Sequence, residues 1–178
     1  MTKQLNDITL SLIVIGAIAL LFLFKIITPF FGSAPELPIE PQKTQVVEKL
    51  VLTTPEWRQR LSAQQYVVMR EDGTEPAFSG AFVHFNEAGT YRCAGCNLPL
   101  FSSADKFDSS TGWASFSQPI SPNNITYKVK GVWIWVKARV HCARCDSHIG
   151  EVYNSGRPPN GKYYSVNSVA LLFEPTKK

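Results

Sequence analysis

Cys93-Ala94-Gly95-Cys96 and Cys142-Ala143-Arg144-Cys145 are the two stretches that decide the fold of this chain. They hold all 4 cysteines among its 178 residues. In each C-x-x-C pair a short turn can present two thiolates to one metal ion, and zinc takes four such ligands at about 2.3 Å. We therefore predict one structural zinc ion, bound by Cys93, Cys96, Cys142 and Cys145.

Local disulfides and a redox-active pair are the two alternatives for these cysteines. A disulfide that spans only two intervening residues tends to be strained and easily reduced. A redox pair needs a catalytic setting, and the sequence shows no thioredoxin-like βαβ pattern. A closed site of four thiolates leaves no position for water, so the predicted zinc stabilises the fold and takes no part in chemistry.

The N-terminal region contains a long apolar run. Residues 8–31 are uncharged except for Lys25, and at about 1.5 Å per residue they can cross a bilayer core of roughly 30 Å. Lys25 lies near one end, where its amine can reach the headgroups. We predict a tail over 1–7 and a transmembrane anchor over 8–31. A cleaved signal peptide is the alternative, but Pro35 directly follows the small residues Gly32-Ser33-Ala34.

The segment after the anchor is a spacer. Residues 32–43 contain three prolines among polar residues, so we predict an extended linker followed by a zinc domain over 44–178. Lys3 and the N-terminal amine before the helix, with acids after it, favour a cytoplasmic N-terminus. We therefore expect a single-pass membrane protein whose domain lies on the extracytoplasmic side, although Lys25 favours the opposite orientation.

The charge of the chain belongs to the domain. Residues 1–43 carry three lysines and three acids, which leaves the formal net charge of +4 to residues 44–178. A surplus of this size without a basic stripe does not indicate nucleic-acid binding. We expect no nucleic acid among the partners.

The remaining pattern predicts a mostly β domain with a short helical section at its start. Thr54-Pro55-Glu56 offers an N-cap threonine, an early proline and a first-turn acid, and Ser62 begins a second helix with capping-box spacing. After Gly73 short apolar and aromatic runs alternate with turn residues, as in antiparallel sheets. The clearest run is 125–142, where we expect a hairpin that turns at Gly131.

The second strand of this hairpin is expected to begin at Val132. Its valines alternate with Trp133 and Trp135, which would lie on the opposite face and pack against another element. A last strand is expected over 165–173.

Several further motifs follow one another along the domain. They are Gly73-Thr74-Glu75-Pro76-Ala77-Phe78-Ser79-Gly80, Gly89-Thr90-Tyr91-Arg92-Cys93, Pro99-Leu100-Phe101, Lys106-Phe107-Asp108-Ser109, Gly112-Trp113-Ala114-Ser115-Phe116, Asp146-Ser147-His148-Ile149-Gly150, Asn167-Ser168 and Leu171-Leu172-Phe173. In this order they resemble the peptide methionine-R-sulfoxide reductases of the B type (MsrB family) over about 56–175. The resemblance implies two antiparallel sheets of the MsrB (Mss4-like) type, N-terminal helices, and a structural zinc remote from the active site.

The resemblance also implies a reaction that depends on one cysteine. In the family a thiolate attacks the sulfoxide sulfur and becomes a sulfenic acid, which a second thiol resolves. The nucleophile stands two residues before the asparagine of the Asn167-Ser168 motif, and here that position holds Ser165. A hydroxyl oxygen cannot be oxidised to an analogue of the sulfenic acid, so serine at this position removes the reaction itself.

Neighbouring positions also depart from the family's pattern. A second histidine, an aspartate, an arginine and a common resolving cysteine are replaced by Glu151, Ser155, Tyr163 and Thr111. The positions to which the resemblance assigns substrate binding are retained as Trp113, His148, Tyr153 and Asn167. Because several groups differ together, natural divergence explains the serine better than a single engineered Cys→Ser change.

Two functions follow directly from the resemblance. The first hypothesis is a membrane-anchored zinc domain without reductase activity, which binds proteins through methionine or methionine sulfoxide side chains. The second is an active peptide-methionine-R-sulfoxide reductase that repairs oxidised methionine. The second would require a zinc-bound cysteine to act as the nucleophile.

Two other functions do not depend on sulfoxide chemistry. Ser165 and Glu151 could form a hydrolytic set with one of the histidines His84, His141 and His148. The chain has no nucleophile-elbow motif, and His141, directly before a zinc ligand, is interpreted as structural. Alternatively, the domain is an assembly part that binds an envelope protein partner.

Overall fold

The computed structural model describes residues 46–130, 137–155 and 158–177. The predicted anchor over 8–31 and the linker over 32–43 lie outside the described residues and stay predictions. Within the described ranges no helix combines the length and the apolar character needed to cross a membrane.

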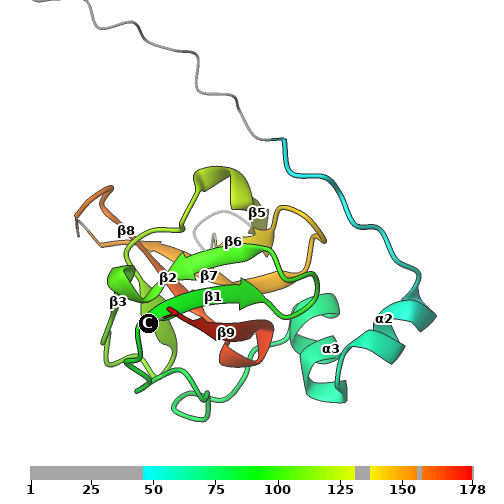
Figure 1. Ribbon diagram of the computed structural model, residues 1–178, viewed down its shortest axis with the longest axis horizontal. Coiled ribbons are helices and arrows are strands. Elements are labelled where there is room, and N and C mark those ends of the chain that lie inside the picture. Colours follow the sequence, from blue (N-terminus) through cyan, green and yellow to red (C-terminus); the bar gives the residue numbers. More distant parts are fainter. Residues whose placement is uncertain (1–45, 131–136, 156–157, 178) are drawn as a thin grey trace, which may run out of the picture. The chain divides into compact units, whose positions relative to one another are not determined.

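The described residues form two antiparallel sheets, so the predicted mostly β class is confirmed (Figure 1). The smaller sheet has the order β2-β1-β9, with β1 Gly89–Cys93, β2 Pro99–Ser102 and β9 Leu171–Pro175. The larger has the order β3-β4-β8-β7-β6-β5, with β3 Lys106–Phe107, β4 Ala114–Phe116, β5 Ile125–Lys130, β6 Lys137–Cys142, β7 His148–Asn154 and β8 Lys162–Val166. Every pairing recorded between these strands is antiparallel.

Two short α-helices precede the sheets, as the sequence predicted. They are α2 Thr54–Arg60 and α3 Ala63–Arg70. The N-cap of α2 is Thr53, one residue before the predicted Thr54, because the Glu56 carboxylate accepts hydrogen bonds from the backbone N–H and the hydroxyl of Thr53. The predicted capping box of α3 is confirmed: Ser62 N–H donates to the Gln65 side chain, and Gln65 N–H donates to the Ser62 hydroxyl.

The prediction of one strand over 165–173 is wrong. The chain leaves the larger sheet at the end of β8, passes through the 3₁₀-helix η4 (Ser168–Ala170), and enters the smaller sheet as β9. The break has a physical cause. The buried Glu75 carboxylate accepts the backbone N–H groups of Ser168 at 2.7 Å and Val169 at 3.1 Å, so these donors are not available to a strand ladder.

The predicted hairpin is present in the parts that the structure describes. β5 and β6 pair from Ile125 opposite Cys142 to Lys130 opposite Lys137. The predicted turn at Gly131 and the predicted strand start at Val132 lie outside the described residues. Two further 3₁₀-helices, η2 (Ser103–Asp105) and η3 (Pro122–Asn124), connect strands elsewhere.

An aromatic cluster joins the faces of the two sheets. The rings of Phe101 on β2 and Phe116 on β4 are stacked at 4.5 Å, and Tyr91 on β1 meets Phe116 edge to face at 5.0 Å. Tyr164 on β8 lies 5.8 Å from Phe101. All four side chains are buried. Each such aromatic pair adds about 0.5–1.5 kcal/mol beyond the burial of its area, so the cluster stabilises the contact between the sheets.

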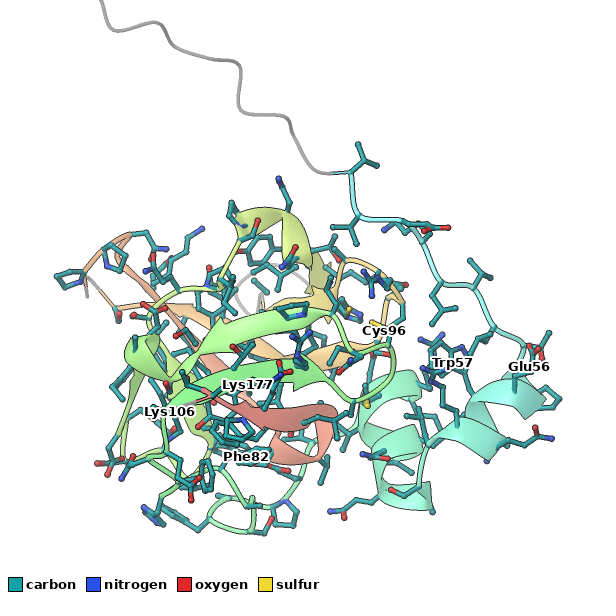
Figure 2. The ribbon with its side chains drawn as sticks, viewed as in Figure 1. Glu56, Trp57, Phe82, Cys96, Lys106 and Lys177 are labelled. Carbon is teal, nitrogen blue, oxygen red and sulfur yellow. The ribbon has the colours of Figure 1, made fainter. Side chains whose placement is uncertain are left out.

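The helices pack against the first cysteine turn. In Figure 2 Trp57 lies on the side of α2 nearer Cys96, and Glu56 lies on the far side. A Cβ on Gly95 would come within 3.4 Å of the Trp57 ring and 3.3 Å of the Met69 methyl group. A residue without a side chain therefore allows the helices to approach this turn closely.

The second cysteine turn is held by the same N-terminal region. The Arg70 guanidinium at the end of α3 donates to the carbonyl of Cys145 at 3.0 Å. Before α2, the backbone N–H of Leu50 donates to the carbonyl of Arg144 at 2.8 Å. The helical section and the two cysteine turns thus form one packing unit.

We predict that the variant Glu75→Gln lowers the free energy of unfolding by about 1–3 kcal/mol, because the amide can accept with only one of its two ends and leaves a buried backbone N–H without an acceptor. Urea unfolding measures the loss. Glu71→Gln is the matched control, since Glu71 forms an exposed ion pair with Arg58 at 3.6 Å and its change should alter stability by less than about 0.5 kcal/mol. Equal effects of the two variants would contradict the role of Glu75.

Candidate functional site: a four-cysteine zinc site and an adjoining polar pocket

The four cysteines converge on one buried point. Sγ of Cys93 lies 3.6 Å from Sγ of Cys145, and Sγ of Cys96 lies 3.4 Å from Sγ of Cys142. Four thiolates around zinc at about 2.3 Å stand roughly 3.8 Å apart. The two measured separations are close to this value, and all four sulfurs lie within 4.8 Å of one another, so the cluster has the size of a tetrahedral zinc site. The four cysteines are buried.

Both cysteine turns have the same backbone geometry. The residue after the second cysteine of each pair has a positive φ and donates its backbone N–H to the carbonyl of the first cysteine. Asn97 has a φ of 62° and donates at 2.7 Å, and Asp146 has a φ of 57° and donates at 2.9 Å. Asparagine and aspartate adopt this left-handed conformation more readily than most residues. The residue following each C-x-x-C pair therefore supports the turn that points both sulfurs at the ion.

The four thiols affect one another strongly. Hydrogen bonds from the neighbouring cysteines, Cys142 first, lower the pKa of Cys145, whereas hydrogen bonds within the same cluster raise the pKa of Cys93 and of Cys142. Sγ of Cys145 also lies 3.2 Å from the hydroxyl of Ser147. The structural zinc predicted from the sequence is confirmed, and Cys93, Cys96, Cys142 and Cys145 are the residues that hold it.

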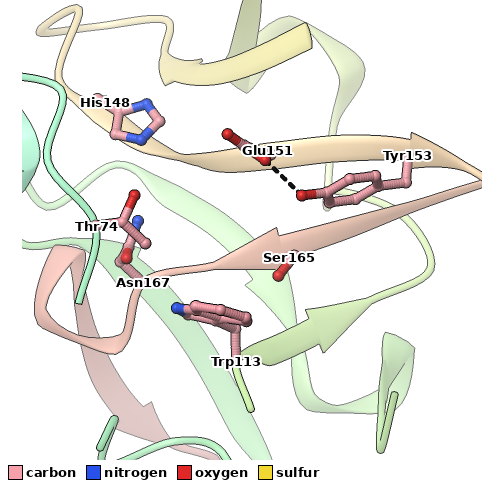
Figure 3. Close-up of a pocket in the computed structure, with 7 residues that line it drawn as sticks. All are labelled: Thr74, Trp113, His148, Glu151, Tyr153, Ser165 and Asn167. Carbon is pink, nitrogen blue, oxygen red and sulfur yellow. Dashed lines mark hydrogen bonds between the residues drawn. The ribbon is translucent and has the colours of Figure 1, made fainter. Parts of the chain in front are cut away.

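A polar pocket of about 140 Å³ lies beside β7 and β8. It is lined by Thr74, Trp113, His148, Glu151, Tyr153, Ser165 and Asn167. His148, Glu151 and Tyr153 belong to β7 and Ser165 belongs to β8, and the other lining residues lie in segments next to the sheet (Figure 3). None of the four zinc ligands lines the pocket, and because they are all the cysteines of the chain, the pocket contains no thiol.

One wall of the pocket is an aromatic and acidic pair. The Tyr153 hydroxyl donates a hydrogen bond to the Glu151 carboxylate (Figure 3). Burial, followed by this hydrogen bond, raises the pKa of Tyr153, so the phenol stays protonated and remains the donor. Glu151 lies directly opposite Ser165 in the pairing of β7 and β8, which places the carboxylate and the hydroxyl on the same face of the sheet.

Asn167 and Trp113 are fixed by hydrogen bonds around Glu75. The Asn167 amide oxygen accepts the backbone N–H of Glu75 at 2.9 Å, and its nitrogen donates to the carbonyl of Ile149 at 3.0 Å. The Trp113 indole N–H donates to the carbonyl of Glu75 at 3.1 Å. One amide hydrogen of Asn167 is the only donor that these contacts leave to a ligand from this side chain. Their fixed orientation pre-forms this side of the pocket.

His148 is the histidine of the pocket, and it is held neutral. Burial, followed by the nearby His141, lowers the pKa of His148 to about 4. At neutral pH its imidazole is therefore uncharged, and a neutral imidazole nitrogen can bind a metal ion. Of the three histidines proposed for a hydrolytic set, His148 alone lines the pocket with Ser165, and His84 is exposed.

Gly150 allows β8 to approach β7 beneath the pocket. A Cβ at this position would stand 2.1 Å from the carbonyl oxygen of Ser165, closer than any side chain permits. The glycine of the His148-Ile149-Gly150 motif therefore brings Ser165 against Glu151.

The structure gathers most of the positions singled out in the sequence, and it separates others. Trp113, His148, Glu151, Tyr153, Ser165 and Asn167 share the pocket. Ser155, Tyr163 and Thr111 do not line the pocket. Ser155 is exposed, the Tyr163 ring stacks on the Tyr153 ring at 5.1 Å, and the Thr111 hydroxyl forms a hydrogen bond with the Ser109 hydroxyl at 2.7 Å. Thr74 lines the pocket but was not predicted to, although it belongs to the Gly73–Gly80 motif that indicated the resemblance.

A zinc-stabilised two-sheet domain with a polar pocket is the class of protein that this fold and site define. Comparison with known families matches residues 61–175 to the SelR domain. The chain is 43% identical to the peptide methionine sulfoxide reductase MsrB of Thiobacillus denitrificans over 123 residues, which cover 69% of this chain and 93% of that protein. It is 39% identical to the chloroplastic peptide methionine sulfoxide reductase B1 of Arabidopsis thaliana over 150 residues, which cover 83% of this chain and 74% of that protein. The chain belongs to the SelR (MsrB) family, as its motifs indicated.

We predict that the variant Cys142→Ser binds less than about one tenth of the zinc of the wild-type protein and loses its cooperative thermal transition, because structural zinc supplies much of the folding free energy of such sites. Zinc content is measured after denaturation, and melting is followed by circular dichroism. Ser147→Ala is the control, since Ser147 contacts a ligand but does not bind the ion. A Cys142→Ser protein with one zinc per chain and an unchanged melting temperature would disprove the assignment.

Proposed function

We propose that this domain recognises methionine or methionine sulfoxide side chains in other proteins and does not reduce them. The observation that carries the proposal is the distribution of thiols. The pocket keeps aromatic and polar groups suited to a sulfoxide, while each of the 4 cysteines of the chain belongs to the buried zinc cluster.

The lining of the pocket supports recognition of a small sulfur group. The Trp113 and Tyr153 rings offer apolar faces for a methyl group and a methylene chain. The Thr74 hydroxyl and the Asn167 amide offer donors to a sulfoxide oxygen. A volume of about 140 Å³ suits one side chain, because sites for drug-sized ligands occupy about 300–1,000 Å³.

The chemistry of reduction argues against turnover. In the thiol route a cysteine thiolate attacks the sulfoxide sulfur, the S–O bond breaks, and the oxygen stays on the cysteine as a sulfenic acid while methionine leaves. A second thiol then condenses with the sulfenic acid to give a disulfide and water. The resemblance puts the nucleophile at Ser165, and serine oxygen cannot accept a further oxygen atom in this way.

An active reductase is the second candidate. It is favoured by relatives of about 40% identity that are named peptide methionine sulfoxide reductases. With this chain it would require a zinc-bound thiolate to act as the nucleophile, although none of the zinc ligands lines the pocket. The two candidates therefore predict different outcomes of one assay.

We predict that the full-length, zinc-loaded protein in detergent binds N-acetyl-methionine-R-sulfoxide but does not reduce it with dithiothreitol as the reductant. Ser165→Cys should reduce the sulfoxide at least tenfold above the background, because it places a thiol in a pocket that already holds the substrate. Ser165→Ala is the matched control and should stay at background. Calorimetry should detect binding of the R epimer in preference to the S epimer, and Trp113→Ala should weaken it at least tenfold.

The outcomes separate the two candidate functions. Turnover by the wild-type protein would overturn the proposal and support the reductase. Absence of binding by either the free sulfoxide or a methionine-sulfoxide peptide would overturn the recognition role as well, and would leave an assembly role with an envelope protein as the alternative.

We also propose that residues 8–31 anchor the domain in a membrane and that the domain lies on the extracytoplasmic side. Their length and apolar character, which Lys25 alone interrupts with a charge, support an anchor, and Lys3 with the acids after the helix supports this orientation.

We predict that the full-length protein stays in the membrane pellet after a carbonate wash, and that deletion of residues 1–31 releases it, because the only long apolar run is removed. If the domain is extracytoplasmic, alkaline phosphatase fused to the C-terminus should be active, and a fluorescent protein fused at the same place should not fluoresce. Release of the full-length chain by carbonate would contradict the anchor. The opposite pattern of the two reporters would contradict the orientation.

A further inference from the structure

Two histidines and an aspartate come together next to the pocket and apart from the four cysteines, and one of them, His148, also lines the pocket. They are Asp72 after α3, His141 on β6 and His148 at the start of β7, and one ligand atom from each lies within 4.8 Å of the others. His141 and His148 are directly opposite in the pairing of β6 and β7, next to an irregularity in the register. Their rings lie 5.3 Å apart.

Both histidines carry a buried nitrogen for which the described residues offer no partner. The side chains are 3% and 2% exposed, and within the described part of the chain neither Nε2 of His141 nor Nδ1 of His148 has a hydrogen-bond partner. A buried polar atom in this state costs about 1–3 kcal/mol, and two of them side by side require an explanation. A ligand that both nitrogens bind would remove that cost.

The other nitrogen of His141 makes the contact typical of a metal ligand. Nδ1 lies 3.1 Å from the backbone carbonyl of Asp146. A carbonyl can only accept, so Nδ1 carries the hydrogen and Nε2 presents its lone pair to the cluster. Histidines that bind metals usually donate their second N–H to a carbonyl or carboxylate in this manner.

Arg139 positions the carboxylate of the cluster. Its guanidinium forms an ion pair with one Asp72 oxygen at 2.7 Å. A carboxylate has two oxygens with about four lone-pair sites, so it can bind a guanidinium and a cation together. Glu151 lies opposite Arg139 in the pairing of β6 and β7. Around the two histidines the carboxylates of Asp72, Asp146 and Glu151 outnumber the cations of Lys128 and Arg139 by one, and this net charge of −1 favours a divalent cation.

We propose that Asp72, His141 and His148 bind a divalent transition metal ion, separate from the structural zinc. Two imidazole nitrogens and one carboxylate oxygen are a ligand set that zinc, iron(II) and cobalt(II) accept, and three protein ligands leave at least one position for water or another ligand. Bonds of about 2.1 Å would bring the ligand atoms to roughly 3.4 Å from one another. Asp72 can supply this movement, because its side chain is 35% exposed and lies in the loop after α3.

The test uses cobalt(II) added to the full-length, zinc-loaded protein in detergent. We expect one further metal ion per chain, with weak visible absorption and without the intense thiolate bands that exchange into the cysteine site would produce. His148→Gln and Asp72→Asn should each weaken this binding at least tenfold without loss of zinc. His84→Gln, which removes the exposed histidine, should leave it unchanged. The result does not depend on whether the pocket binds methionine sulfoxide.

A second measurement needs no variant. In nuclear magnetic resonance spectra of the wild-type protein, substoichiometric nickel(II) should broaden the imidazole signals of His141 and His148 before those of His84. The proposal would be overturned if no second metal ion binds, or if the second ion still binds to both variants. It would also be overturned if nickel(II) broadens the signals of His84 first.

Discussion

The four-thiolate zinc cluster is the constraint on which the rest of the domain depends. It joins the turn after β1, in the smaller sheet, to the turn after β6, in the larger sheet, through sulfurs that lie 46 to 52 residues apart in the sequence. The segment before α2 and the end of α3 donate hydrogen bonds to carbonyls of the second turn. Zinc therefore fixes both sheets and the helices relative to one another, beside the aromatic cluster that fills the space between the sheets.

The same cluster determines what the pocket can do. Because all thiols of the chain serve the metal, the pocket is built from hydroxyl, amide, imidazole, carboxylate and aromatic groups. The arrangement of the pocket residues depends on Glu75. Its backbone forms hydrogen bonds with the side chains of Trp113 and Asn167, and its carboxylate accepts a hydrogen bond at the start of η4. A buried carboxylate and the backbone next to it thus hold one side of the pocket in place.

One face of the larger sheet connects the pocket to the histidine cluster. His148 lines the pocket and also lies beside His141, and Glu151 contributes to the pocket wall while it faces Arg139. A metal ion bound by the cluster would alter the electrostatic potential of the pocket, since His148 is common to both. The pocket and the histidine cluster therefore share polar side chains of β7 and lie beside one another on the larger sheet.

Features that depend on local spacing could be predicted from the sequence: the zinc ligands, the capping box at Ser62, the mostly β class and the family. Features that depend on distant partners could not. The strand predicted over 165–173 is divided because Glu75, 93 residues before Ser168, binds the backbone of η4. Asp72 and Thr74 reach β7 only when α3 packs on the sheet, and His141 faces His148 because the β6–β7 register shifts at that point. Residue types and their spacing determined the metal site and the fold class. Tertiary packing determined which polar side chains meet, because the distances between those side chains are set by strand register and helix packing and not by sequence separation.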